Sequence, residues 1–500
     1  MPGYRKNALL NIFFNYSNII FNIVYGILLI PLYLKKIPLD VYGSFIVASG
    51  ISVLIGLLEF GLSMVTTQRL STSYAASDKT IFKSIISNGA VTATLLFCIS
   101  ALLSLVIGSK IAEITKVNLD YTRDIYVAFL FLSIAGAINI YLNLFGSIFQ
   151  ALLRAGILGV INLASTIIGI LTILLSFSCW PSLTSIAAGS IIRTMSATLL
   201  LMIFAYLTLR EKRLLPKMSD IKIKIVINLL ESSAPIFIGG LSKSIVENMQ
   251  NIMLVNILSP TTVAIISLTQ KIFQLCGMVL APIGSSIYSV FVQIKSKTTQ
   301  ENFSKLIEIA IKSQFLLTIA LIGIANTFND DFVILWVGND KYGGFLLSTL
   351  LGLSMLFSSR YYFFSFLIYS NGEFKKTAKI ELSYAILKIL ILYILIGEIG
   401  LYAVPVAEII PGLLFQFLLS ARIVSTYIIN KNQNWIYLKG WFEYIIITVV
   451  GYYYLIGYGK LENWTSLIYS IVIFSLITLI IIILLNINLY KEIIYYLKNR

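Results

Sequence analysis

The sequence predicts an all-α membrane protein that crosses the bilayer about 14 times, because of its composition and its repeated long apolar segments. Hydrophobic residues make up 58% of the 500-residue chain, and charged residues make up only 12%. A water-soluble domain carries about 25% charged residues, and a disordered chain has low hydrophobicity. The composition therefore excludes both a water-soluble globular protein and a disordered one.

Apolar segments long enough to cross the membrane recur along the whole chain. A helix needs about 20 residues to cross about 30 Å of hydrocarbon. We expect spans at 9–31, 41–66, 85–108, 125–149, 155–178, 183–209, 231–258, 263–292, 308–328, 343–370, 378–397, 399–428, 441–458 and 464–489. A β-barrel would instead show alternating segments of about ten residues. The first span lacks the small-residue cleavage pattern of a signal peptide, so we expect it to be retained.

The Lys and Arg residues between the spans predict the orientation of the chain. With the N-terminus in the cytoplasm, about 24 of the 37 basic residues fall on the cytoplasmic side, and about seven fall on the opposite side. Cytoplasmic loops are the ones that carry an excess of Lys and Arg, so we expect both termini in the cytoplasm. The net charge of +15 is then mainly a topology signal, and we expect no nucleic acid partner.

A weak internal repeat predicts the domain organisation. A shift of about 222 residues, which separates Lys83 from Lys305, aligns the first six spans with the next six. Six is an even number, so the two halves are parallel repeats, a common plan among transporters. We expect an N-terminal six-helix bundle over 1–210, a cytoplasmic linker over 211–224, a C-terminal six-helix bundle over 225–430, and spans 13 and 14 within 431–500. The alternative is that any chain with many spans can be shifted into rough register.

Amide side chains recur at helical spacing in several predicted spans. They occur in the first, fourth and eighth spans at Asn11, Asn15, Asn18, Asn22, Asn139, Asn143, Gln270 and Gln274. An amide without a hydrogen-bond partner is costly in hydrocarbon, so each stripe must face protein or water. Hydrogen bonds between helices would explain them, and so would the polar wall of a central cavity. Several such helices in one chain favour the hydrated cavity.

Basic residues also lie deep within the predicted spans. The five deepest are Arg193, Lys243, Lys271, Arg360 and Lys388. A cation at the bilayer centre costs at least about 2.5 kcal/mol, so it persists where it faces a cavity, pairs or binds. Lys243 shares a helix face with Glu247, and Lys388 shares one with Glu381 and Tyr384, so pairs within one helix can explain these two. The other three have no carboxylate three or four residues away and are the better candidates for binding an anion.

Residues that the chain lacks exclude several classes of enzyme. The chain has no histidine, which rules out histidine-based acid–base catalysis and histidine metal sites. It has no Walker A loop and no loop large enough for a soluble catalytic domain. We therefore expect that the protein is not an enzyme and that it binds neither a cofactor nor a metal. Glu59 and Glu408 lie within spans. A buried carboxylate holds a proton readily, so each is a candidate for proton coupling or a counter-ion for a lysine.

Short motifs carry a resemblance to a known family. The first two spans contain Pro31-Leu32-Tyr33-Leu34, Asp40-Val41-Tyr42-Gly43 and Glu59-Phe60-Gly61-Leu62, followed by Arg69. Gln150 and Arg154 follow the fourth span, and Ser267-Leu268-Thr269-Gln270-Lys271-Ile272 lies in the eighth. In this order the motifs resemble those of Wzx-type O-antigen flippases, which belong to the multidrug/oligosaccharidyl-lipid/polysaccharide (MOP) exporter superfamily. Glu59 stands where that family more often has Asp.

The resemblance implies a fold, a location and a function. The two halves would form a MATE-like V with a cationic cavity that opens alternately to each side of the bacterial inner membrane. The protein would move undecaprenyl-pyrophosphate-linked O-antigen repeat units from the cytoplasmic to the periplasmic leaflet. Arg193, Lys271 and Arg360 would hold the pyrophosphate or an acidic sugar, and the amides would meet sugar hydroxyls. The O-antigen polymerase and the chain-length regulator would be its protein partners, and membrane lipid would surround it.

Two other functions stay open. A drug/cation antiporter of the same fold would share the span pattern, because fold alone does not determine substrate. A membrane enzyme such as an O-antigen polymerase or an acyltransferase is the other alternative. A polymerase would be expected to have a large periplasmic loop, and an acyltransferase usually has a histidine in the membrane. Neither feature occurs in the sequence, which favours transport over catalysis.

Overall fold

The described part of the protein is built from helices. The structure is a computed structural model that describes residues 17, 20–21, 23–59, 61–152, 154–294, 299–369, 374–427, 434–459 and 461–487. Within these ranges every regular element is an α-helix or a short 3-10 helix, and none is a strand. The prediction of an all-α membrane protein is therefore confirmed.

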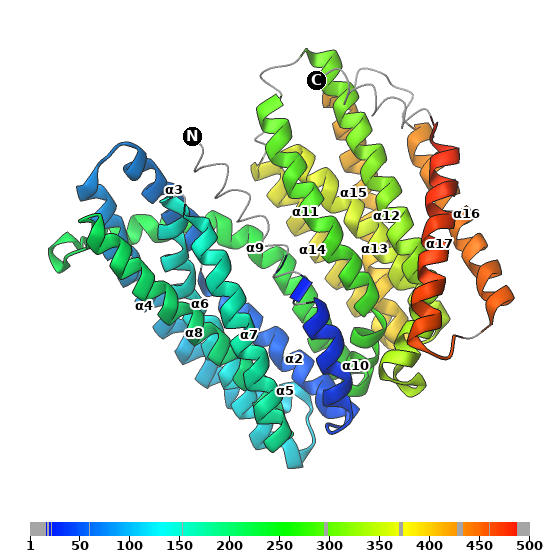
Figure 1. Cartoon of the computed structure of the whole chain (residues 1–500), viewed down its shortest axis with the longest axis horizontal. Helices are drawn as coiled ribbons and strands as arrows, with labels where there is room; N and C mark the ends of the chain where they lie inside the picture. Colours follow the sequence, from blue (N-terminus) through cyan, green and yellow to red (C-terminus); the bar gives the residue numbers. More distant parts are fainter. Residues whose placement is uncertain are drawn as a thin grey trace. The chain divides into compact units, whose positions relative to one another are not determined.

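The first compact unit covers residues 1–264. A short apolar helix, Ile23–Leu34, comes first. The following helices are α2 (Leu39–Gly56), α3 (Leu62–Ala75), α4 (Lys79–Gly108), α5 (Ile111–Thr115), α6 (Thr122–Ala151), α7 (Ala155–Cys179), α8 (Leu183–Glu211) and α9 (Ile223–Ile257). In Figure 1, α4, α6 and α8 pack side by side in this unit.

The second compact unit covers residues 265–500. Its helices are α10 (Pro260–Thr269), which begins just before the unit does, α11 (Lys271–Ile294), α12 (Gln300–Val337), α13 (Phe345–Tyr369), α14 (Phe374–Ile399), α15 (Ala403–Tyr427), α16 (Asn434–Tyr458) and α17 (Trp464–Leu485). The last two helices pack against α12 (Figure 1).

The boundary between the two compact units lies within α10, between residues 264 and 265, so that α9 groups with the first unit. The physical reason is packing, because α9 contacts α2, α3 and α4. Arg69 of α3 holds α9 directly, since its Nη2 donates to Asn228 Oδ1 at 2.6 Å and to Ser232 Oγ at 2.7 Å. The expected two-bundle division with a separate C-terminal pair stays a prediction.

The predicted spans from the second to the fourteenth fall on helices. Among the described residues, nine helical segments are long and apolar enough to cross a membrane, and one bent pair would make ten. Segment 377–419 includes most of α14 and most of α15, and the chain turns between these two helices at Gly400. That glycine has φ +58°, a left-handed conformation that favours glycine. Asn11, Asn15, Asn18 and Asn22 of the first span lie outside the described residues.

Two of the predicted spans are interrupted by breaks in the helix. In the second span, α2 passes through a 3-10 turn, Leu57–Glu59, before α3 begins, and Gly61 at this break has φ +70°. In the eighth span, α10 and α11 meet at a bend of 52° around Gln270. The second and eighth spans correspond in the predicted repeat.

The core of each unit is apolar and aromatic, whereas many large apolar side chains face outward. In the first unit, Phe82, Phe149 and Leu201 are buried together. In the second unit, Tyr361, Phe364 and Tyr384 belong to one such cluster. Leu102 and Ile480 are among many apolar residues that are more than half exposed. A soluble protein rarely exposes so much apolar surface, so the outer faces of these helices are suited to lipid.

Candidate functional site

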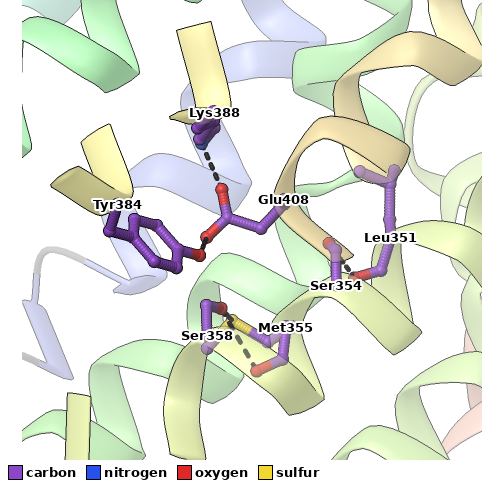
Figure 2. A network of polar contacts seen from close by, with 7 residues as sticks. All are labelled: Leu351, Ser354, Met355, Ser358, Tyr384, Lys388 and Glu408. Atoms are coloured by element: carbon purple, nitrogen blue, oxygen red, sulfur yellow. Dashed lines mark hydrogen bonds and ion pairs between the residues drawn. The ribbon is translucent and has the colours of Figure 1, made fainter. Parts of the chain in front are cut away.

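A buried ion pair joins α14 to α15 in the second unit. Lys388 Nζ contacts Glu408 Oε2, and the Tyr384 hydroxyl donates to Glu408 Oε1 at 2.6 Å. Figure 2 shows Lys388 and Tyr384 of α14 reaching the same carboxylate from two sides. Tyr384 is fixed in turn by stacking on Tyr361 of α13, with ring centroids 4.3 Å apart. We call Tyr384, Lys388 and Glu408 the α14–α15 triad.

The triad changes the interpretation of Lys388 and Glu408. The sequence offered Glu381, on the same helix, as the partner of Lys388, but the structure places Glu408 of the next helix there instead. The carboxylate of Glu408 touches the ammonium of Lys388, so the contacts favour a counter-ion role for Glu408 over proton coupling. Whether either residue meets a substrate stays a prediction.

Arg360 of α13 lies in an aromatic cluster. Its guanidinium carbon is 3.8 Å from the ring centroid of Phe315 and 5.3 Å from that of Phe364. These are cation–π distances, and only 1% of the residue is exposed. Gln314 and Ser359, the residues before Phe315 and Arg360, bond to each other at 3.2 Å and link α12 to α13. Contact between Arg360 and a substrate would require this packing to open.

Lys271 is the first residue of α11 and follows directly after the bend. The bend is held by two hydrogen bonds to Thr269. Asn329 Nδ2 of α12 donates to its carbonyl oxygen at 2.9 Å, and the Gly343 backbone N–H donates to its hydroxyl at 2.9 Å. Lys271 is half-buried and has no ion pair among the described residues, and Gln274 beyond it is exposed. A broken helix with an adjacent ammonium is the kind of arrangement that binds an anion within the membrane.

The two remaining predicted cations lie in the first unit. Arg193 of α8 is exposed, and the start of its side chain packs over Gly169 of α7, where an added Cβ would lie 2.8 Å from the Arg193 Cβ. The side chain of Lys243 in α9 lies outside the described residues, as does that of Glu247. The predicted cationic site therefore draws on both units, and its convergence on one cavity stays a prediction.

Glu59 lies at the break in the second span. Its carboxylate accepts hydrogen bonds from Asn143 Nδ2 at 2.6 Å and from the Ser63 backbone N–H at 3.1 Å. No ion pair of Glu59 occurs in the described part of the chain. Glu59 differs from Glu408 in this respect, because its recorded partners are neutral. Asn143 is thus engaged by a carboxylate, whereas Asn139 one turn earlier is exposed.

A polar cavity of about 390 Å³ lies in the first unit between α3, α6 and α7. Asn143 and Gln150 line it, as do Gln68 and Asn162. The last two were not singled out in the sequence. The signal that would have found Gln68 is its place in α3, two helical turns after Glu59 and Gly61, beside Arg69. Asn162 is the only amide in its predicted span and forms no stripe of its own.

The repeated long apolar helices and the helical fold identify a multi-pass α-helical membrane protein. The chain belongs to the polysaccharide biosynthesis protein family, whose model matches residues 6–295. No curated protein is similar enough in sequence to give a match. The family prediction and the fold prediction are both confirmed.

Two solved structures of other proteins are similar to this one in fold. The lipid II flippase MurJ in an inward closed conformation matches with a TM-score of 0.71 and 15% identity, over 97% of this chain and 100% of that one. An inward-facing MATE multidrug resistance transporter of the MOP superfamily matches with a TM-score of 0.68 and 15% identity, over 82% and 95%. At this identity the likeness shows the fold alone.

Proposed function

We propose that the protein is a flippase for undecaprenyl-pyrophosphate-linked O-antigen repeat units. The observation that carries the proposal is the match to the polysaccharide biosynthesis family over 290 of the 500 residues. Two further features support it. The flippase MurJ is similar in fold over almost the whole length of both chains, and cations without a carboxylate nearby in sequence lie in the spans. The protein would lie in the bacterial inner membrane with both termini in the cytoplasm, beside the O-antigen polymerase and chain-length regulator.

Alternating access is the mechanism that this architecture supports. A pyrophosphate needs cationic hydrogen-bond donors, which Arg and Lys supply. Arg193, Lys271 and Arg360 are proposed to hold it, with Lys243 and Lys388 contributing charge. Amides such as Asn139, Gln270 and Gln274 would meet the sugar hydroxyls. The lipid tail needs no protein site, because it can remain in the bilayer while the polar head crosses.

A drug/cation antiporter is the second candidate, favoured by the likeness to a multidrug MATE transporter. That structure covers 82% of this chain, whereas MurJ covers 97%. The basic residues within the predicted spans also argue against a cationic cargo, because like charges repel. Ethidium efflux from cells that produce the protein distinguishes the two candidates. Efflux above that of cells with an empty vector would support the antiporter.

Neutralising the candidate cations tests the proposed flippase. We expect Arg193→Ala, Lys271→Ala and Arg360→Ala each to reduce surface polysaccharide in a strain that lacks its own flippase. The loss of one charge-assisted contact to phosphate, worth about 1.5–3 kcal/mol, corresponds to about a 10- to 150-fold weaker interaction. Surface display is measured by immunoblot at equal protein level.

Lys305→Ala is the matched control for these variants. Lys305 is exposed at the start of α12, and its ion-pair partner Glu301 is exposed as well. We expect it to display polysaccharide like the wild type. Wild-type display in all three span variants, at normal protein levels, would contradict the cationic site.

Proton coupling through Glu59 is tested with an imposed pH gradient. We propose that Glu59 takes up a proton from the periplasmic side and releases it to the cytoplasm as the head group moves outward. An acidic outer compartment should then speed wild-type flipping in proteoliposomes. Glu59→Gln keeps a hydrogen-bonding oxygen for Asn143 but cannot lose a proton, so we expect its rate not to respond to the gradient. A variant that responds as the wild type does would exclude this role.

A further inference from the structure

The polar cavity between α3, α6 and α7 is built from neutral hydrogen-bonding groups. Its polar side chains are Ser63, Thr67, Gln68, Asn143, Gln150 and Asn162, and no charged residue lines it. Its volume of about 390 Å³ lies in the range of small-molecule sites. We refer to it below as the amide cavity. All its walls belong to the first unit.

Three of these amides are available to a ligand. The side chains of Gln68, Gln150 and Asn162 make no hydrogen bond within the described ranges, unlike Asn143, which Glu59 holds. Gln68 and Gln150 are exposed, and Asn162 is half-buried. Such amides are costly against hydrocarbon. The amide cavity is therefore suited to water or to a polar ligand, and not to a lipid tail.

The donors and acceptors in the amide cavity define the class of ligand. Each amide offers both an acceptor oxygen and a donor NH2 group, which suits a ligand whose own groups both donate and accept. Hydroxyl groups have this property, whereas a phosphate or an organic cation calls for charge. Leu142 and Leu158 line the same cavity and can cover the apolar face of a sugar ring. The chemistry fits a neutral sugar.

A second, basic pocket adjoins the amide cavity. Its volume is about 680 Å³, and Gln68 lines both spaces. Arg69 and Lys222 supply two cations, against one carboxylate from Asp78. Among the described residues Arg69 bonds through Nη2 alone, to α9, which leaves Nε and Nη1 available. This pocket therefore offers phosphate donors directly beside the sugar donors.

We propose that these two spaces form a loading site, in which the amide cavity binds the first sugars of the substrate and the basic pocket binds the phosphate that joins them to the lipid. In the predicted orientation α3 ends at the cytoplasmic surface, where the precursor would arrive. The proposal rests on the proposed function and adds a sugar-binding site to it. It differs from the cationic site at Arg193, Lys271 and Arg360, none of which lines either space.

Binding of three lipids by purified protein in neutral nanodiscs tests the loading site. The probes are undecaprenyl pyrophosphate that carries one N-acetylglucosamine, sugar-free undecaprenyl pyrophosphate, and phosphatidylglycerol. We expect the wild type to bind the sugar-bearing lipid most tightly. Gln150→Leu combined with Asn162→Leu should weaken that lipid about tenfold, because two neutral hydrogen bonds are lost. The affinity for the sugar-free lipid should stay the same.

Two further variants separate the two spaces. Lys222→Ala should weaken both undecaprenyl lipids equally, since both carry the pyrophosphate. Gln300→Leu removes an exposed amide at the start of α12 and should change neither affinity. Gln68→Leu, a single substitution at an exposed position, repeats the amide test if the double variant is poorly folded.

The outcomes distinguish this proposal from the proposed function. If the wild type binds the sugar-bearing lipid and the amide variants bind it equally well, the amide cavity is not a sugar site. Equal affinity of the wild type for the two undecaprenyl lipids would also overturn the sugar site. Tighter binding of phosphatidylglycerol would make the basic pocket a phospholipid site and overturn the loading site. If the wild type binds none of the three lipids, the proposed function fails along with it.

Discussion

Lys388→Met is expected to destabilise the protein by about 3–5 kcal/mol, because it leaves the carboxylate of Glu408 buried without its cation. Only 7% of Lys388 is exposed, and the pair lies between two packed helices. Removing one partner of such a pair costs more than replacing both by apolar residues of similar volume. We therefore expect Lys388→Met combined with Glu408→Leu to recover most of the lost stability. The measurement is thermal unfolding in detergent, followed by tryptophan fluorescence.

Lys305→Met is the matched control for this prediction. Lys305 pairs with Glu301 at 3.1 Å, but both side chains are more than half exposed. An exposed pair of this kind contributes little, so we expect almost no change in unfolding temperature. If Lys388→Met behaved like Lys305→Met, the α14–α15 triad would not be the stabilising contact described here. A double variant as unstable as Lys388→Met would show that Tyr384 cannot adapt to the loss of the charge.

Gly43→Ala is expected to disrupt the first unit and abolish transport. A Cβ at this position would lie 1.9 Å from the carbonyl oxygen of Pro260 and 2.6 Å from its carbonyl carbon. Both atoms belong to the backbone, so the clash cannot be removed by rotating a side chain. It is removed only if α2 and the start of α10 move apart. Core overpacking costs about 1–3 kcal/mol, occasionally more, and a clash with backbone lies at the upper end. Protein yield and surface polysaccharide display measure the effect.

Gly397→Ala is the control for Gly43→Ala. A Cβ at Gly397 meets no atom within 4 Å, and the residue lies inside α14. Alanine is a better helix former than glycine by about 1 kcal/mol, so this variant should be as stable as the wild type or more so. Normal yield and display of Gly43→Ala would mean that α2 and Pro260 do not approach so closely in the membrane.

The helices were predictable because the bilayer imposes a length and a polarity on each span. The turn between α14 and α15 is an example, since the sequence placed one span end at 397 and the next start at 399. The structure places the turn between Ile399 and Ala403. The motif Asp40-Val41-Tyr42-Gly43 was visible as a resemblance only. Its physical reason, the contact of Gly43 with Pro260, joins residues far apart in the sequence.

The contacts of the candidate site were less predictable, because they join different helices. Spacing along one helix pointed to Glu381 as the partner of Lys388, whereas the partner is Glu408, on α15. Arg360 has one ring contact that the sequence could predict and one that it could not. Phe364 is four residues away and lies on the same helix face, but Phe315 comes from α12 and has no local signal. Whether the side chains of Gln68 and Asn162 are available to a ligand is equally hard to predict, because it depends on which residues of other helices lie near them.

The bend at Gln270 has a consequence for the energetics of binding. Asn329 is fully buried and donates to Ser348 Oγ at 2.8 Å as well as to the Thr269 carbonyl. The bend is therefore held by hydrogen bonds within the protein itself. The start of α11 and the backbone of Lys271 are preorganised, so an anion that binds there does not have to order them. In Asn329→Leu the start of α11 would have to become ordered when the anion binds. Titration calorimetry would detect this as a less favourable binding entropy.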